Sequence, residues 1–230
     1  DPRIRWVVQV AHRAAAKSTL AVLIALGRLL QSNMPIRIII VSTDIDAGKV
    51  LIQIARMLVL LNPTLGQQFK VHQWKIVRES SGGEIEVMSS DAASFYGQLP
   101  SMIIADEMTH WPATAEKLWE AVASTLPKRS DLELIVLSNA GWSDSWQFPI
   151  FEQFKATPWC SYQHVEGFVP WIDPHQLEAQ RRLLPESAYR RLWLNTWVAG
   201  VGDLLATDDV DAAITLDGPA WQRPDGTGAV

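Results

Sequence analysis

A short segment near the start of the chain has the residue types of a phosphate-binding loop. Residues 11–19 read Ala-His-Arg-Ala-Ala-Ala-Lys-Ser-Thr and lie between an apolar run and a helical one. The segment matches the pattern G-x-x-x-x-G-K-[ST], but alanine stands at both glycine positions, Ala11 and Ala16. In such a loop the backbone N–H groups surround the phosphates, the lysine reaches the outer phosphates and the hydroxyl binds Mg²⁺. Lys17 and Ser18 keep the last two roles available.

The two alanines weaken this match. A loop of this kind uses glycine where the backbone needs a positive φ, and an L-residue held there costs on the order of 1 kcal/mol. The segment alone is therefore a weak indication of a nucleotide site, and the rest of the chain must decide.

Two further polar groups follow apolar strands. Asp106-Glu107 comes directly after Met-Ile-Ile-Ala, and Ser138-Asn139 comes directly after Leu-Ile-Val-Leu. In a parallel sheet, the carboxyl ends of these strands meet the loop at one edge. An acid there can hold the shell of a Mg²⁺ ion, a second carboxylate can orient the attacking water, and a polar side chain nearby can sense the phosphate. The alternative is that the acidic pair only caps the helix that follows.

The elements that would position these groups alternate between strands and helices. Strands are predicted over 5–10, 36–42, 102–105, 132–137 and 161–166, with an exposed or edge strand over 84–88. Helices are predicted over 19–31, 47–61, 113–124, 147–155, 174–183 and 186–198, and residues 64–82 are predicted to be irregular. This order predicts an α/β fold, with a mainly parallel sheet and helices on both faces.

Composition limits the function classes. The chain has 230 residues, which suits one large α/β domain, and a formal net charge of −5, which argues against a generally basic nucleic-acid coat. The single cysteine excludes an internal disulfide framework and suggests a reducing compartment. No apolar run is long enough to span a bilayer, and no signal peptide is apparent.

The order of these motifs resembles the ATPase domain of a phage terminase large subunit, the DNA-packaging motor. The resemblance rests on Ala-x₄-Ala-Lys-Ser-Thr, Met-Ile-Ile-Ala-Asp-Glu and Leu-Ile-Val-Leu-Ser-Asn-Ala-Gly, with the intervening segment 89–98, and covers residues 5–145. It implies a P-loop NTPase fold of the ASCE or RecA-like kind. It also implies hydrolysis of ATP, bound with Mg²⁺, that powers translocation of viral double-stranded DNA into a procapsid.

The resemblance also implies roles for individual residues. Ser18 and Asp106 would hold the metal, and Ser138 and Asn139 would couple hydrolysis to movement. The nucleotide would be bound by Ala14, Ala15, Ala16, Lys17, Ser18 and Thr19, and the catalytic residues would be Glu107, Lys17 and Arg13. Residues 89–105 hold no Arg or Lys, so Arg13 and Arg129 remain the candidates for charge stabilisation.

The same resemblance predicts domains and partners. Residues 1–205 would form the ATPase domain, with its N-terminal adenine-recognition segment truncated, which leaves base selectivity open. Residues 206–230 would be a linker toward a C-terminal nuclease domain, so this chain is not expected to cut DNA. The expected partners are double-stranded DNA, the portal protein, the small terminase subunit and further copies in a ring, with no membrane. The expected location is the host cytoplasm, at the procapsid.

Other interpretations stay open. The chain could be another P-loop ATPase of the helicase-like kind, or a degenerate, non-hydrolysing P-loop fold that binds DNA or a partner protein. Residues 70–78 interleave basic and aromatic side chains, which suits either a single-strand binder or a surface hairpin. The arginine pairs at 181–182 and 190–191 could contact DNA or form a solvated helix face. His12 is predicted to be an exposed loop residue.

Overall fold

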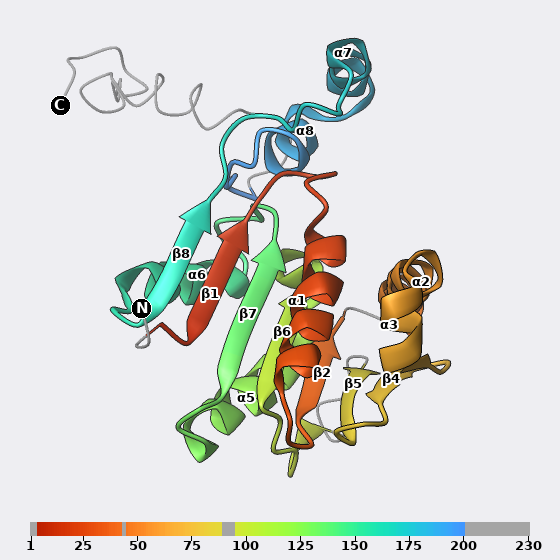
Figure 1. Ribbon diagram of the computed structural model, residues 1–230. Helices are drawn as coiled ribbons and strands as arrows, with labels where there is room; N and C mark the ends of the chain where they lie inside the picture. Colours follow the sequence, from red (N-terminus) through yellow and green to blue (C-terminus); the bar gives the residue numbers. More distant parts are fainter. Residues whose placement is uncertain (1–3, 43–44, 89–94, 201–230) are drawn as a thin grey trace, which may run out of the picture.

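The computed structural model describes residues 4–42, 45–88 and 95–200, with side chains omitted at 45–47. Within them lies an eight-stranded sheet in the order β3-β4-β5-β2-β6-β7-β1-β8 (Figure 1). Its strands are β1 (Trp6–Val10), β2 (Arg37–Val41), β3 (Lys70–Val71), β4 (Lys75–Arg78), β5 (Gly83–Met88), β6 (Met102–Asp106), β7 (Glu133–Ser138) and β8 (Cys160–His164).

Six neighbouring strands of this sheet run parallel, from β5 through β2, β6, β7 and β1 to β8. The register pairs Val10 with Ser138 and Asp106 with Leu137. The strands β3 and β4 extend the sheet beyond β5 as an antiparallel hairpin. The predicted mainly parallel sheet is therefore confirmed, and the carboxyl ends of β1, β6 and β7 lie together.

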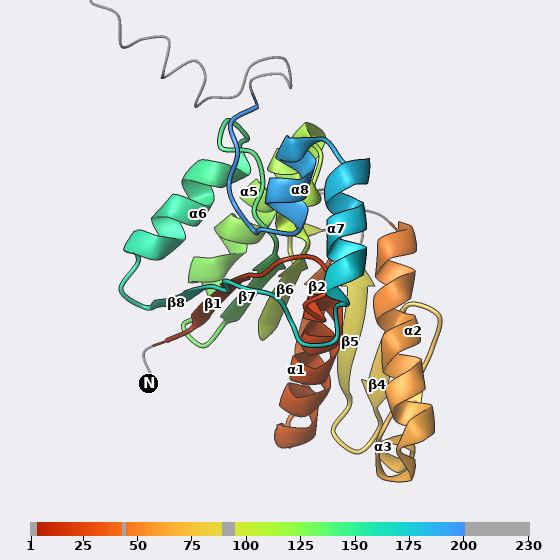
Figure 2. The same ribbon diagram turned by 90° about the horizontal axis from the view of Figure 1, so that it is seen from above.

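Helices cover both faces of the sheet, as predicted (Figure 2). The helices α1 (Lys17–Gln31) and α2 (Ile45–Leu61) lie on one face, and α5 (Glu116–Thr125) and α6 (Gln147–Ala156) lie on the other. Each face of the sheet packs a hydrophobic core against its helices. Because side chains alternate along a strand, Ile38 and Ile40 of β2 belong to the core beneath α1 and α2, whereas Ile39 and Val41 belong to the core beneath α5 and α6. All four are buried, which explains why β2 is apolar after its first residue, Arg37.

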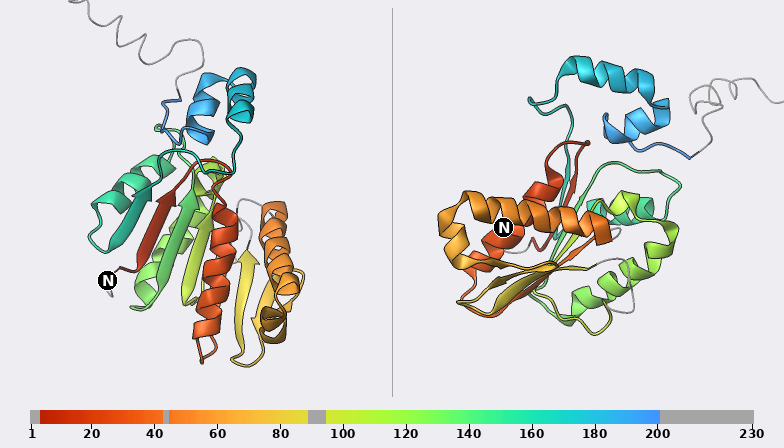
Figure 3. Two further views of the ribbon diagram at one scale, coloured as in Figure 1. Left: turned by 45° about the horizontal axis from the view of Figure 1, so that its top comes forward. Right: turned by 90° about the vertical axis from the view of Figure 1, so that its right-hand side faces the viewer.

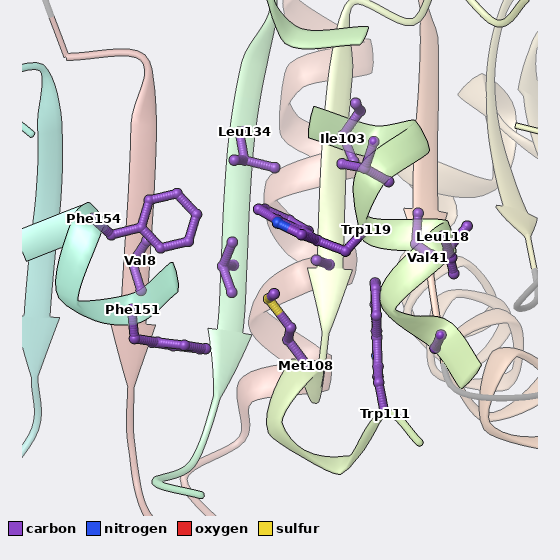
Figure 4. Close-up of a cluster of buried hydrophobic side chains, with 14 of the residues drawn as sticks. Val8, Val41, Ile103, Met108, Trp111, Leu118, Trp119, Leu134, Phe151 and Phe154 are labelled. Atoms are coloured by element: carbon purple, nitrogen blue, oxygen red, sulfur yellow. The ribbon is translucent and has the colours of Figure 1, made fainter. Parts of the chain in front are cut away.

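The core on the α5 and α6 side is rich in aromatic rings (Figure 4). Trp119 of α5 and Phe151 of α6 both contact Phe154 edge to face, with ring centroids 5.9 and 6.2 Å apart. Val8 and Leu134 of the sheet belong to the same cluster. This packing fixes α5 and α6 against the strands whose ends carry the polar motifs.

Two further helices lie beyond the carboxyl ends of the strands (Figure 3). These are α7 (Pro174–Leu183) and α8 (Glu186–Leu192). The Asp173 side chain accepts a hydrogen bond from the backbone N–H of His175 and so caps α7. The chain between β8 and α7 passes close to the loop of residues 11–16, so this end of the sheet is partly covered.

Three predictions about local structure are wrong. Residues 64–82 are not irregular, because α3 (Pro63–Gln68) and the β3–β4 hairpin lie there. The last predicted helix ends at Leu192 instead of continuing to residue 198. The strand β5 is not at an edge, because it pairs with both β2 and β4. Its alternating glutamates misled the prediction, since Glu84 and Glu86 form ion pairs with Arg37 of β2.

Some predictions fall outside the described residues. The proposed linker at 206–230 is one of them, and most of the segment 89–98 is another. In the described part of the chain, no helix is long and apolar enough to cross a bilayer.

Candidate active site

The loop between β1 and α1 contains two alanines in the left-handed region. Ala14 has φ 63° and Ala16 has φ 56°, whereas Ala11 does not have a positive φ. Ala11 is instead buried, and its N–H donates a hydrogen bond to the Ser138 carbonyl at 2.8 Å. Of the two glycine positions in the sequence pattern, only the one held by Ala16 therefore requires the conformation that glycine favours.

Lys17 is the first residue of α1, and its side chain folds back over the loop. Its ammonium group donates hydrogen bonds to the carbonyls of Ala11, at 3.1 Å, and His12, at 3.0 Å. The same ammonium group lies 3.4 Å from Oε1 of Glu107. Lys17 as a whole is only 5% exposed. A buried ammonium needs such partners, because an unpaired charge is costly to remove from water.

Ser18 and Asp106 meet across 88 positions of sequence. The Ser18 hydroxyl donates to Oδ2 of Asp106 at 3.0 Å. Burial, helped by the nearby negative charge of Glu107, raises the pKa of Asp106 to about 6. The other carboxylate oxygen, Oδ1, is buried and has no hydrogen-bond partner. A buried carboxylate with an unused oxygen beside a hydroxyl is a donor set suited to a hard cation.

Glu107 is also in the left-handed region, with φ 51° and ψ 41°. Its N–H donates to the Leu137 carbonyl at 2.7 Å, and the short 3₁₀ helix η1 (Met108–His110) follows directly. This sharp turn at the end of β6 directs the side chain back to Lys17. The other carboxylate oxygen, Oε2, is buried without a hydrogen-bond partner.

Ser138 and Asn139 at the end of β7 are tied to η1. The Ser138 hydroxyl accepts a hydrogen bond from the N–H of Thr109 at 3.0 Å and shares another with the Thr109 hydroxyl at 2.8 Å. Thr109 also donates to the Asn139 carbonyl at 3.0 Å. The ring Nε2 of His110 lies 2.6 Å from Oδ1 of Asn139. Thr109 and His110 were not predicted, although they follow the acidic pair by only two and three positions.

Asn195 is a second residue that sequence reasoning missed. It is 1% exposed and has φ 54°. Its side-chain oxygen accepts from the N–H of Ala140 at 2.9 Å, and its amide donates to the carbonyls of Val10, at 3.0 Å, and Val165, at 3.1 Å. One asparagine thus joins the ends of β1, β7 and β8. An isolated asparagine carries no sequence signal for such a role.

The prediction that His12 is exposed is wrong, because the residue is completely buried. Phe168, from the chain between β8 and α7, packs edge to face on its ring, with centroids 5.6 Å apart. In the same stretch, the indole N–H of Trp171 donates to the Ala14 carbonyl at 3.1 Å. A segment distant in sequence therefore covers the loop, and the loop sequence alone could not reveal this.

The two candidate arginines lie in different places. Arg13 is exposed and lines a cleft at the carboxyl ends of the strands. Arg129 forms an ion pair with Asp131 at 2.7 Å in the turn before β7 and is not among the residues that line this cleft. Of the C-terminal arginine pairs, Arg182 pairs with Glu178, and Arg191 stacks on Trp142 with its guanidinium 4.0 Å from the ring centroid. These two side chains therefore each contact a neighbour within the chain.

The cleft has a volume of about 340 Å³ and brings together five of the predicted site residues, whereas Lys17, Thr19, Ser138 and the three loop alanines are not among the residues that line it. It is lined by Arg13, Ser18, Ser42, Val50, Asp106, Glu107, His110, Asn139 and Leu192. In the part of the chain that the structure describes, no three His, Cys, Asp or Glu side chains cluster as a metal site. The candidate cation ligands in the cleft are Ser18 and Asp106, and Mg²⁺ beside a nucleotide is usually held by one or two protein ligands together with the phosphates.

Comparison with known families identifies one match. The sequence model for "Terminase large subunit, ATPase domain" matches residues 3–147, which include the loop, the acidic pair and Ser138-Asn139. No sequence among the curated proteins matches the chain.

Solved structures with the same fold include several phage proteins. The large terminase of bacteriophage HK97 is 15% identical, with a TM-score of 0.73, and the match covers 84% of this chain and 47% of that protein. The large terminase of a thermophilic bacteriophage, in complex with ADP, is 12% identical, with a TM-score of 0.70 and coverage of 86% and 49%. The chain thus spans about half the length of these two proteins.

A third structure contains an ATPase domain alone. The large terminase ATPase domain of Thermus phage P74-26 is 17% identical, with a TM-score of 0.67, and the match covers 85% of this chain and 89% of that domain. At these identities the likeness concerns the fold, which is that of a P-loop ATPase domain.

Proposed function

Because the chain belongs to the family of terminase large subunit ATPase domains, we propose that it hydrolyses ATP in the cleft beside residues 11–19. The contact between Lys17 and Glu107 carries this proposal. A buried ammonium group lies 3.4 Å from the carboxylate that follows the acidic strand, although the sequence separates the two residues widely. A P-loop fold that only bound a partner would have no need of this pair.

The chemistry follows from what each group can do. Lys17 exchanges its present contacts for the outer phosphates of ATP and neutralises the charge that develops as the γ-phosphate leaves. This exchange releases Glu107, whose carboxylate then orients the attacking water. The backbone of Ala14, Ala15 and Ala16 and the start of α1, including Thr19, supply N–H groups to the phosphates. Arg13 lines the cleft and can add positive charge there.

Ser18 and Asp106 fit a Mg²⁺ ion. Their direct contact at 3.0 Å and the unpartnered Oδ1 of Asp106 support this assignment. When bound, the ion would neutralise phosphate charge and orient the phosphoryl oxygens. The two side chains would hold it through the serine hydroxyl and a carboxylate oxygen.

The wider role is proposed from the family. Hydrolysis would drive translocation of viral double-stranded DNA into a procapsid, with Ser138 and Asn139 coupling the loss of phosphate to movement. Residues 1–205 would be the working ATPase domain, and 206–230 would lead toward a nuclease domain. The partners would be the portal protein, the small terminase subunit and further copies in a ring, in the host cytoplasm.

The experiment compares two variants of the chain with two matched controls. Lys17→Ala and Glu107→Gln are each expected to abolish release of phosphate from ATP in the presence of Mg²⁺. Glu107→Gln should still bind ATP in calorimetry, because the carboxylate acts on water and not on the phosphates. Lys117→Ala and Glu120→Gln make the same changes on the exposed face of α5 and should leave turnover unchanged.

The outcomes separate ATP hydrolysis at this site from a degenerate fold. Turnover by both site variants at the parent rate would refute the assignment of Lys17 and Glu107. A parent chain that binds no nucleotide would instead identify a degenerate P-loop fold.

A further inference from the structure

We propose that His110 is a positioning residue. Its Nε2–H group donates a hydrogen bond either to Asn139 or to the carboxylate of Glu107. The choice between these acceptors relays to the coupling pair, Ser138 and Asn139, whether the hydrolytic carboxylate is still held by Lys17. This inference rests on the proposed ATPase function. His110 lies at the end of η1, with Nε2 2.6 Å from Oδ1 of Asn139 and 3.7 Å from Oε2 of Glu107. The ring nitrogen is therefore hydrogen-bonded to Asn139 and lies just beyond hydrogen-bond distance of Glu107.

The hydrogen-bond network around Asn139 fixes where the proton on His110 lies. The Asn139 amide nitrogen donates to the carbonyls of Ala140, at 2.7 Å, and Arg191, at 3.5 Å. An amide nitrogen cannot accept, so the side-chain oxygen must be the atom that faces His110. That oxygen can only accept, and Nε2 of His110 must therefore carry a hydrogen and donate it.

Glu107 competes for this hydrogen. Its Oε2 is buried, has no hydrogen-bond partner and lies within 3.7 Å of the same nitrogen. One N–H group makes one good hydrogen bond at a time, and a buried carboxylate oxygen gains more from it than an amide oxygen does. At present Lys17 holds the other oxygen of Glu107 at 3.4 Å, which keeps the carboxylate turned toward the loop.

ATP binding would change the outcome of this competition. When Lys17 turns to the phosphates, Glu107 loses its cation and becomes free to accept the Nε2–H of His110. That hydrogen bond would hold Glu107 in one rotamer for the attack of water, and Asn139 would lose its partner. Because Asn139 also contacts the Arg191 carbonyl of α8, the change would reach the helices beyond the sheet.

The backbone around His110 is fixed, so that only side chains need to move. The N–H of His110 donates to the Glu107 carbonyl at 2.9 Å, and Thr109 is bonded to both Ser138 and Asn139. A ring rotation or a small shift of the carboxylate is enough to exchange the two hydrogen bonds. A relay requires this exchange, whereas a passive contact would leave the hydrogen bond between His110 and Asn139 unchanged.

The first test observes the ring without any turnover. Histidine ring nitrogen NMR spectra of the nucleotide-free chain should show His110 with hydrogen on Nε2, assigned from the signal lost in His110→Ala. Addition of Mg²⁺ with a non-hydrolysable ATP analogue should shift this signal, and Glu107→Gln should greatly reduce the shift. A ring signal that does not move when the analogue binds, with binding shown by calorimetry, would overturn the relay.

The second test measures turnover. His110→Ala should lower kcat by roughly tenfold to a hundredfold, the loss expected when a catalytic group is poorly positioned. Affinity for the ATP analogue should stay within a few-fold of the parent, because His110 does not contact the phosphates. His110→Gln, which keeps an N–H donor, should recover part of kcat, and His72→Ala on the exposed hairpin should match the parent.

These measurements separate the relay from the proposed function. A parent that turns over ATP while His110→Ala has an unchanged kcat overturns only the relay. A His110→Gln variant no better than His110→Ala does the same, since a donor would then not be the property that matters. A parent that binds the analogue but does not hydrolyse ATP overturns the proposed function, and the relay with it.

Discussion

Replacing Ala16 with glycine should stabilise this protein, although glycine usually destabilises a folded chain. Ala16 immediately precedes α1 with φ 56° and ψ 27°, in the left-handed region. The residue is exposed and is not part of either hydrophobic core, so removal of its methyl group leaves no core cavity. The substitution therefore isolates the backbone strain of the loop from packing.

The magnitude follows from two opposing effects. An alanine held in the left-handed region costs about 1–2 kcal/mol relative to the right-handed region, and glycine removes that cost. Glycine also gives the unfolded chain more freedom, which lowers the stability of the fold by roughly 0.5–1 kcal/mol. The net effect of Ala16→Gly should be a gain of about 0–1.5 kcal/mol in the free energy of unfolding.

The neighbouring positions provide controls. Ala15 does not have a positive φ, so Ala15→Gly should lose about 0.5–1 kcal/mol. Ala11 occupies the other glycine position of the sequence pattern but also lacks a positive φ, so Ala11→Gly should destabilise the fold as well.

Denaturation in urea, followed by far-UV circular dichroism, should give Ala16→Gly a free energy of unfolding about 1–2 kcal/mol higher than that of Ala15→Gly. For a chain of this size, that difference corresponds to roughly 2–8 °C in Tm. If Ala16→Gly is no more stable than Ala15→Gly, the claim that this loop stores backbone strain is refuted.

Three further predictions concern other parts of the site. Burial raises the pKa of Asp106 from 3.8 to about 6, so the folded, metal-free protein keeps a proton that the unfolded chain has released. Its free energy of unfolding should therefore fall by up to about 3 kcal/mol as the pH rises from 4 to 6. Urea denaturation at pH 4 and at pH 6 should show this decline in the parent and not in Asp106→Asn. Asn195→Ala removes hydrogen bonds to three segments and leaves the N–H of buried Ala140 without its partner, so it should cost about 1–3 kcal/mol, seen as a lower Tm; an unchanged Tm would contradict its bridging role. Trp171→Phe removes the hydrogen bond to Ala14 and should speed amide exchange at residues 13–16 while exchange in β6 stays constant.

The sequence was informative for the buried strands and for the polar pairs that follow them, because both have a recognisable local pattern of residues. The strands β2, β6 and β7 are short, mainly apolar runs rich in β-branched residues, and each was predicted within about two residues because the central positions of a strand buried on both faces are all apolar. The polar pairs after β6 and β7 were predicted to meet the loop at one edge. The hydrogen bond between Ser18 and Asp106 places these two groups in contact there.

The sequence was uninformative where a residue depends on a distant neighbour. Glu84 and Glu86 suggested a solvent-facing strand, because their partner Arg37 is on another strand. His12 suggested an exposed loop, because the chain that buries it follows β8. A pattern within a dozen residues records the period of an element, but it does not record which element packs against it.

The distribution of strained residues strengthens the assignment of this edge as the working part of the molecule. Among the described residues, the non-glycine residues with positive φ are Ala14, Ala16, Glu107 and Asn195. The first two form the loop, Glu107 carries the proposed hydrolytic carboxylate, and Asn195 joins the ends of three strands. A fold that needed only stability would place glycine at such positions or avoid them, since each costs on the order of 1 kcal/mol or more.

Backbone hydrogen bonds from the end of β7 reach each of the three segments that contain these strained residues. The Leu137 carbonyl accepts from the N–H of Glu107, the Ser138 carbonyl accepts from Ala11, and the N–H of Ala140 donates to Asn195. The loop, the acidic turn and the bridging asparagine are therefore each fixed to one short segment that also contains the proposed coupling pair. A displacement of that segment would relax or tighten all of them together, which is the mechanical property that a domain converting phosphate loss into movement requires.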